Sequence, residues 1–188
     1  MFDPGKVKAV LWDLDDTLYS RVAAARLTYP GMFRTHLYEG KDDAYIEAAA
    51  EYVKRLSRFC KLEIVELPED RLPDDPSQAQ IDAALAKEAD AIRAKLPASC
   101  YIIAMCVEGK TRSSEELARL MADAANQGGS HLVFLIGGSF GLHPSVKSLA
   151  AVKLSMSPMT FPHHLARVML LEQIYRGYQI NAGSRYHK

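Results

Sequence analysis

The stretch from residue 131 to residue 161 constrains the fold of this chain more than any other part of the sequence. It opens with an apolar run, residues 132–136, whose length and branching are typical of a strand buried on both faces of a parallel sheet. The run ends at Gly137 and Gly138. Two glycines at the carboxyl end of a buried strand allow a sharp turn and let a ligand approach the main chain closely.

A second short apolar piece, residues 152–156, leads into a loop without charged side chains, residues 157–162. Pro158 and Pro162 each remove one backbone donor from this loop. Two uncharged loops at the same end of a sheet suit a flat, mostly neutral ligand that is recognised by backbone groups. We expect an adenosine moiety to fit that description.

Apolar periodicity elsewhere alternates between strand and helix patterns. The expected order is strand, helix, strand, helix, strand, helix, strand, short helix, strand, helix. Capping boxes at Ser77 with Gln80 and at Ser113 with Glu116 mark two of the helix starts. This alternation predicts an α/β fold, with a parallel sheet covered by helices on both faces. Ligands then bind beyond the carboxyl ends of the strands, here residues 105–109, 136–141 and 156–161.

The net charge of the chain is zero, but its distribution is uneven. Residues 146–188 contain six lysines and arginines and one acid, Glu172. A basic end on a neutral chain is typical of a nucleic-acid contact, and chance clustering of surface lysines is the alternative. No apolar run is long enough to span a bilayer, and no secretory signal precedes the first strand. Three cysteines without metal-ligand spacing favour reduced thiols and a cytoplasmic location.

The segment DLDDTL, residues 13–18, follows an apolar strand at residues 8–14 and resembles the opening motif of the haloacid dehalogenase (HAD) superfamily. The resemblance implies that Asp13 is a nucleophile towards phosphate and Asp15 an acid/base, with a magnesium ion between them. The later motifs of that superfamily are missing. We therefore expect this strand to complete another sheet, with both acids in solvent. A magnesium-dependent phosphohydrolase is the alternative function.

Pro162 suits the first turn of a final helix that is apolar over a broad arc. His163 and Arg167 share one face of this helix, whereas Arg176 points to the opposite side, where Glu172 can pair with it. The chain ends in the segment YHK, which either folds over an anionic substrate or frays.

Three segments, IGGSFGLH, MTFPHHLARVMLLEQIYR and the terminal YHK, closely resemble the RlmH family of SPOUT-class methyltransferases. The match runs from about residue 43 to residue 188. The resemblance implies a SPOUT-type sheet with a C-terminal trefoil knot, a homodimer, and S-adenosylmethionine as methyl donor. It also implies that the partner is ribosomal RNA or the ribosome, that no membrane is involved, and that N3 of a pseudouridine in large-subunit ribosomal RNA is methylated.

The resemblance also assigns site residues. The cofactor contacts it implies are Met105, where the family usually has Leu, then Gly137, Met156, Ser157, Pro158, Met159, Thr160 and Phe161. Arg167 would stabilise charge that develops at the target nitrogen, and no metal is needed. The other candidate catalytic residues are His163, Tyr186, His187 and Lys188.

Members of that family begin with a short strand that ends in a Val-Gly-Lys type loop, which this chain lacks. We therefore divide the chain into a HAD-like N-terminal fragment, residues 1–42, and a SPOUT methyltransferase domain, residues 43–188. The strand at residues 8–14 is expected to substitute for the missing strand or to dock poorly. A catalytically impaired chimera that only binds RNA or the ribosome is the third possible function.

Overall fold

The computed structural model of the chain describes residues 8–15, 42–68, 72–126 and 131–187. Its strands and helices, in chain order, are β1 (Lys8–Asp15), α2 (Asp42–Leu56), β2 (Lys61–Pro68), α3 (Gln78–Lys95), β3 (Tyr101–Thr111), α4 (Ser114–Asn126), β4 (His131–Ile136), α5 (Pro144–Lys147), β5 (Val152–Ser155) and α6 (His163–Asn181). This order confirms the alternation of strands and helices predicted from the sequence.

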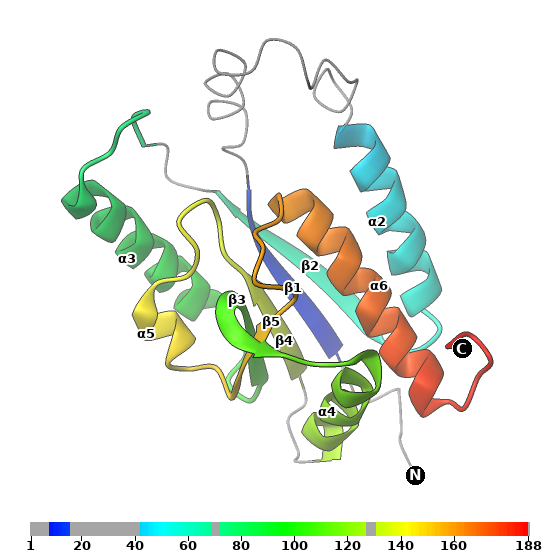
Figure 1. Cartoon of the computed structure of the whole chain (residues 1–188). Helices are drawn as coiled ribbons and strands as arrows, with labels where there is room; N and C mark the ends of the chain where they lie inside the picture. Colours follow the sequence, from blue (N-terminus) through cyan, green and yellow to red (C-terminus); the bar gives the residue numbers. More distant parts are fainter. Residues whose placement is uncertain (1–7, 16–41, 69–71, 127–130, 188) are drawn as a thin grey trace.

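Within the described residues, five strands form one parallel sheet in the order β2-β1-β4-β3-β5 (Figure 1). The first strand lies between β2 and β4, with Leu11 level with Ile64 on one side and with Phe134 on the other. The strand predicted at residues 8–14 is therefore an inner strand of the sheet, and that it substitutes for the strand missing from the family pattern stays a prediction. The predicted division into two segments at residue 42 stays a prediction.

Helices cover both faces of the sheet, as predicted (Figure 1). Because successive residues of a strand point to opposite faces, β4 contributes to two cores. Leu132, Phe134 and Ile136 belong to the core that also contains residues of α2, α4 and α6. Val133 and Leu135 belong to the core on the other face, with residues of α3 and α5.

Both predicted capping boxes are present. At the start of α3, the Gln80 amide donates to Ser77 Oγ (3.4 Å) and the Ser77 amide donates to Gln80 Oε1 (2.9 Å). At the start of α4, the Glu116 amide donates to Ser113 Oγ (3.2 Å) and the Ser113 amide donates to Glu116 Oε2 (2.8 Å). These reciprocal bonds satisfy backbone donors that a helix start otherwise leaves open, so both helices begin where the sequence indicates.

The connections of the last three strands position the site. Between β4 and β5 the chain passes from one side of β3 to the other through α5. The carboxyl ends of β3, β4 and β5 therefore lie at one edge of the sheet as neighbours, where ligands of parallel sheets bind. In the part of the chain that the structure describes, no helix combines the length and apolar character needed to cross a bilayer.

We predict that Leu171→Ala lowers the free energy of unfolding by about 2–5 kcal/mol, because it leaves a cavity in the core beneath α6. Leu171 is fully buried. Leu149→Ala is the matched control, since Leu149 is 47% exposed and the same atoms are removed. Urea unfolding at one fixed protein concentration measures both variants. Equal losses of unfolding free energy in the two variants would show that Leu171 does not pack in the core as described.

Candidate functional site

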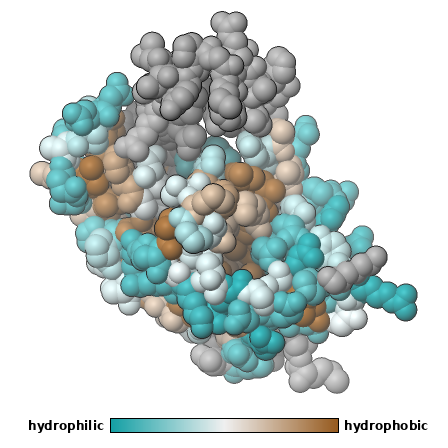
Figure 2. Space-filling model, in the orientation of Figure 1, coloured by the Kyte–Doolittle hydropathy of each residue, from teal (hydrophilic) through white to brown (hydrophobic). Residues whose placement is uncertain are grey.

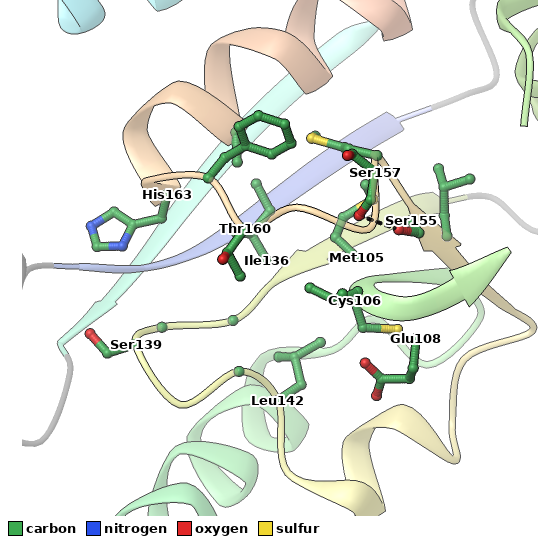
Figure 3. A pocket seen from close by; sticks show the side chains of 18 of the residues that line it. Met105, Cys106, Glu108, Ile136, Ser139, Leu142, Ser155, Ser157, Thr160 and His163 are labelled. Carbon is green, nitrogen blue, oxygen red and sulfur yellow. Dashed lines mark hydrogen bonds between the residues drawn. The ribbon is translucent and has the colours of Figure 1, made fainter. Parts of the chain in front are cut away.

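Three loops at the carboxyl edge of β3, β4 and β5 enclose a cavity of about 670 Å³. They are the outer part of β3, the β4–α5 loop and the β5–α6 loop, and Figure 3 shows their side chains around the cavity. The lining is uncharged over most of its surface. A cavity of this size is typical of a site for one small molecule, for which the common range is roughly 300–1,000 Å³.

The β4–α5 loop is built on contact between glycines. A Cβ added at Gly137 would lie 2.5 Å from the carbonyl carbon of Gly141. The Gly141 amide donates to the Gly138 carbonyl (2.9 Å) and closes a tight turn. Gly141 has a φ of +77°, a conformation that favours glycine. This loop can therefore present its backbone to a ligand without side chains in between.

The β5–α6 loop is held by its own serines. Ser155 Oγ donates to the Ser157 carbonyl (2.9 Å), and the Met159 amide donates to Ser157 Oγ (3.0 Å). Figure 2 shows apolar residues gathered on this face near the start of α6, and Met159 is 66% exposed. The loop thus offers apolar side chains and backbone groups in a fixed arrangement, without any charge of its own.

The outer part of β3 departs from the sequence prediction. The sequence predicts that the strand ends within residues 105–109, but it continues to Thr111 with a break in register. Met105 and Lys110 are both level with Leu154 of β5, so the residues between them leave the sheet. A Cβ at Gly109 would lie 2.6 Å from the Leu154 backbone, which explains why this bulge contains a glycine. The bulge places three further residues in the lining, Cys106, Val107 and Glu108, which lie within the predicted strand end but were not assigned individually as site residues.

One ion pair lies in the cavity wall. Lys147 Nζ of α5 donates to Glu108 Oε1 at 2.5 Å. This hydrogen bond is the main reason that the pKa of the Glu108 carboxyl lies below its usual value. Burial, and then the charge of Glu108, raise the pKa of the neighbouring Cys106 thiol. At neutral pH the carboxyl is therefore ionised and the thiol is protonated.

The two candidate catalytic residues of α6 have different surroundings. His163 is 6% exposed and lines the cavity, with its ring 4.6 Å from that of His164. Arg167 does not line the cavity. Its Nη1 donates to Glu66 Oε1 of β2 at 2.6 Å, and its side chain is 11% exposed. His163 is thus in place to contact a ligand, whereas Arg167 must release Glu66 or be approached by the substrate.

The terminal segment lies at the other end of α6 (Figure 1). Tyr186 OH donates to Glu172 Oε1 (3.3 Å), and its ring lies 5.0 Å from that of Tyr175. His187 Nε2 lies 2.7 Å from Glu115 Oε1 of α4, and Arg176 contacts His187 Nδ1 at 3.3 Å. The segment is therefore bound to α4 and α6 as far as residue 187, which excludes the frayed alternative for these residues. The predicted pair of Glu172 with Arg176 is present.

The structure thus gathers most, but not all, of the predicted site residues. Those that line the cavity are Met105, Gly137, Met156, Ser157, Met159, Thr160, Phe161 and His163. Those that lie elsewhere are Pro158, Arg167, Tyr186 and His187, and Lys188 is outside the described residues. The missed residue with the most informative contacts is Lys147, which lies 39 positions from its partner and has no local sequence signal.

The HAD-like motif falls partly outside the described residues. Asp13 and Asp15 belong to β1, where the backbone is level with Glu66 and Pro68 of β2, and the structure does not describe their side chains. Thr17 and Leu18 are outside the described ranges. Where side chains are described, no group of three or more histidines, cysteines and acids is arranged to hold a metal ion.

Comparison with known proteins adds independent information. A family model described as "Predicted SPOUT methyltransferase" matches residues 36–187. Because this match begins at residue 36, it gives no support to the resemblance of residues 13–18 to haloacid dehalogenases.

Curated relatives match the same part of the chain. A protein of Clostridium novyi is 50% identical over 147 residues, which is 78% of this chain and 92% of that protein. One of Levilactobacillus brevis is 45% identical over 148 residues, 79% of this chain and 93% of that protein. One of Clostridioides difficile is 49% identical over 138 residues, which is 73% of this chain and 87% of that protein. All three are named ribosomal RNA large subunit methyltransferase H.

We predict that Gly137→Ala distorts the cavity, because the new methyl group would overlap the Gly141 backbone. Gly141→Ala is the control: its Cβ meets open space, so only the left-handed backbone costs stability, about 1–2 kcal/mol. Amide NMR spectra and urea unfolding compare the two. Gly137→Ala is expected to lose more stability than Gly141→Ala. Its amide chemical shifts are expected to change over residues 105–109 and 155–161. Equal effects would show that the loop is not packed as described.

Proposed function

This chain belongs to the SPOUT methyltransferase family, and from that membership we propose that it methylates large-subunit ribosomal RNA with S-adenosylmethionine as methyl donor. The observation that carries the proposal is the cavity enclosed by three loops at one edge of the sheet. It lies where the family resemblance assigns the cofactor contacts, and it includes seven of those eight residues, all except Pro158.

The residues present fit this donor. The cavity is of suitable size, its loops are mostly uncharged, and the β4–α5 loop is packed so tightly that an added Cβ at Gly137 would collide with the Gly141 backbone. Met105 and the loop from Met156 to Phe161 would hold the nucleoside through apolar contacts and backbone groups. When bound, S-adenosylmethionine supplies an electrophilic methyl group on a sulfonium. The protein must then orient the target nitrogen and exclude water.

We propose N3 of a pseudouridine as the methylated atom. N3–H is weakly acidic because two ring carbonyls flank it, so negative charge spreads over the ring as the proton leaves. A buried histidine in the cavity wall can accept that proton or donate to a carbonyl oxygen, and the position of His163 in this wall supports assigning the task to it. Arg167 would stabilise the developing charge after it gives up its hydrogen bond to Glu66 and donates to the substrate instead.

The position of the terminal segment supports a homodimer as part of the proposal. Tyr186 and His187 contact Glu172 and Arg176, which follow His163 by 9 and 13 residues, so roughly 14–20 Å of helix at the usual rise per residue separates the cavity end of α6 from the tail. Within one protomer Tyr186 and His187 therefore lie far from the cavity. In a homodimer the tail of one protomer would instead serve the cavity of its partner. A C-terminal trefoil knot and a cytoplasmic location complete the proposed description.

The function is tested by incubating the protein with methyl-labelled S-adenosylmethionine and ribosomes that lack this modification. We expect label in large-subunit ribosomal RNA, at N3 of one pseudouridine, as located by nuclease digestion and mass spectrometry. Free ribosomal RNA, tested in parallel, identifies the preferred form of the substrate. Binding of the donor without any transfer to either form would favour the RNA-binding chimera instead.

We predict that Arg167→Ala lowers the rate of methyl transfer at least tenfold while the donor binds with unchanged affinity, because Arg167 does not line the cavity. Calorimetry and single-turnover kinetics measure the two quantities. Arg55→Ala is the control, since Arg55 is also paired with a glutamate but lies on α2. Full methyl transfer by Arg167→Ala would show that this arginine only ties α6 to β2.

Removal of residues 186–188 is predicted to spare donor binding and abolish methyl transfer. In a homodimer, the truncated protein has intact cavities and no tails. Mixing it with Gly137→Ala, which has tails and distorted cavities, should restore part of the activity through mixed dimers. Restoration is expected only if the tail acts on the partner's cavity. An inactive mixture whose mixed dimers are verified by native mass spectrometry would contradict this role.

A further inference from the structure

The charges in the cavity wall are few. Among the lining residues, all of which lie in the described part of the chain, Glu108 and Lys147 carry full charges, and His163 carries one only when protonated. Glu108 and Lys147 are paired with each other at 2.5 Å. The cavity therefore contains one carboxylate acceptor whose charge is already balanced.

This carboxylate is able to accept more hydrogen bonds. The hydrogen bond from Lys147 lowers the pKa of Glu108, so the group is ionised at neutral pH. An ionised carboxylate has about four acceptor positions, and Lys147 occupies one of them at Oε1. The Glu108 side chain is 54% exposed, so a ligand in the cavity can reach it.

The location of Glu108 indicates which part of the donor it meets. Figure 3 shows Glu108 on the side of the cavity that Cys106 and Leu142 form, and His163 at the opposite end, nearer to Ser139. His163 marks the end at which the target base is expected. A donor whose methyl group faces His163 has its other two parts, the nucleoside and the amino-acid part, towards the other end, where Glu108 lies.

The charge balance of the ion pair favours hydroxyl groups over an ammonium group. An ammonium would bring a second cation to a carboxylate that Lys147 already neutralises, at a cost from repulsion between the two cations. Hydroxyl groups donate to the carboxylate without adding charge. An acidic side chain at a strand end binds ribose in the same way in dinucleotide-binding folds.

From these observations we propose that Glu108 recognises the ribose hydroxyl groups of the methyl donor and that Lys147 positions its carboxylate. This assignment rests on the proposed function, since it places one part of the donor in one part of the cavity. Lys147 is well placed for such a role because α5 is itself held in position. His143 caps α5 through Ser145, and Arg93 of α3 donates to the Ser145 hydroxyl.

The test is calorimetric binding of three ligands to the full chain. S-adenosylhomocysteine contains every group except the methyl, methylthioadenosine lacks the amino-acid part, and the 2′-deoxy analogue of S-adenosylhomocysteine lacks one ribose hydroxyl. The variants are E108A, which removes the carboxylate, and E108Q, which keeps its shape without the charge. E51A is the matched control, because Glu51 is also paired with a cation but lies on α2.

We expect E108A to bind S-adenosylhomocysteine and methylthioadenosine more weakly by the same factor, roughly 10- to 100-fold, as expected for the loss of a hydrogen bond to a charged group. The 2′-deoxy analogue should bind the unaltered protein more weakly than S-adenosylhomocysteine does, and the two should bind E108A equally. K147M should lower the affinity for the same ligands. K147R should bind them as the unaltered protein does, because an arginine can also hold the carboxylate. The affinity of E108Q for these ligands is expected to be intermediate, and that of E51A is expected to be unchanged.

Two results would overturn the assignment while leaving the proposed function intact. One is a loss in E108A that is confined to S-adenosylhomocysteine, since the carboxylate would then bind the amino-acid part. The other is unchanged binding of all three ligands by E108A. If the unaltered protein binds none of the three ligands, the proposed function fails and this assignment fails with it.

Discussion

Close packing of backbone against backbone at one edge of the sheet is the constraint on which the rest of this structure depends. Gly109 lies against the backbone of Leu154, and Gly137 lies against that of Gly141, at separations that leave no room for a Cβ. The first contact holds the outer part of β3 against β5, and the second folds the β4–α5 loop tightly on itself, and both of these segments line the cavity. Since glycine alone tolerates them, the shape of the cavity follows directly from two positions in the sequence.

The sequence predicted the parts of the fold that depend on local patterns. Alternating apolar periods gave the order of strands and helices, and the serines at positions 77 and 113 gave two helix starts, because periodicity and capping act over a few residues. The glycine pair at positions 137 and 138 and the uncharged loop at residues 157–162 predicted two of the three walls of the cavity. The third wall was expected at the end of β3, but the bulge that forms it interrupts the strand pattern instead of ending it.

The contacts between distant residues could not be predicted in this way. Lys147 meets Glu108 across 39 positions and Arg167 meets Glu66 across 101, and nothing in either neighbourhood indicates the partner. The same pairs change how the basic segment of the chain is understood. Of the five cations of this segment that the structure describes, three are paired with acids, and two of these acids come from β2 and β3, so less of the charge is open to a nucleic acid than the composition suggests.

The arrangement separates two tasks along α6. Its first turn supplies His163 to the cavity, whereas Glu172 and Arg176, further along the helix, contact Tyr186 and His187. A single protomer therefore keeps its donor cavity and its terminal segment apart. The proposed homodimer would bring them together, with the terminal segment of one protomer at the cavity of its partner.

A crystal structure with bound S-adenosylhomocysteine would show whether the three loops of one chain form the donor site. We expect density for the ligand inside the cavity, in contact with Met105, with the backbone at Gly137 and with the loop before α6. Ligand density at another surface, or loops that lie apart from one another in the crystal, would contradict this donor site.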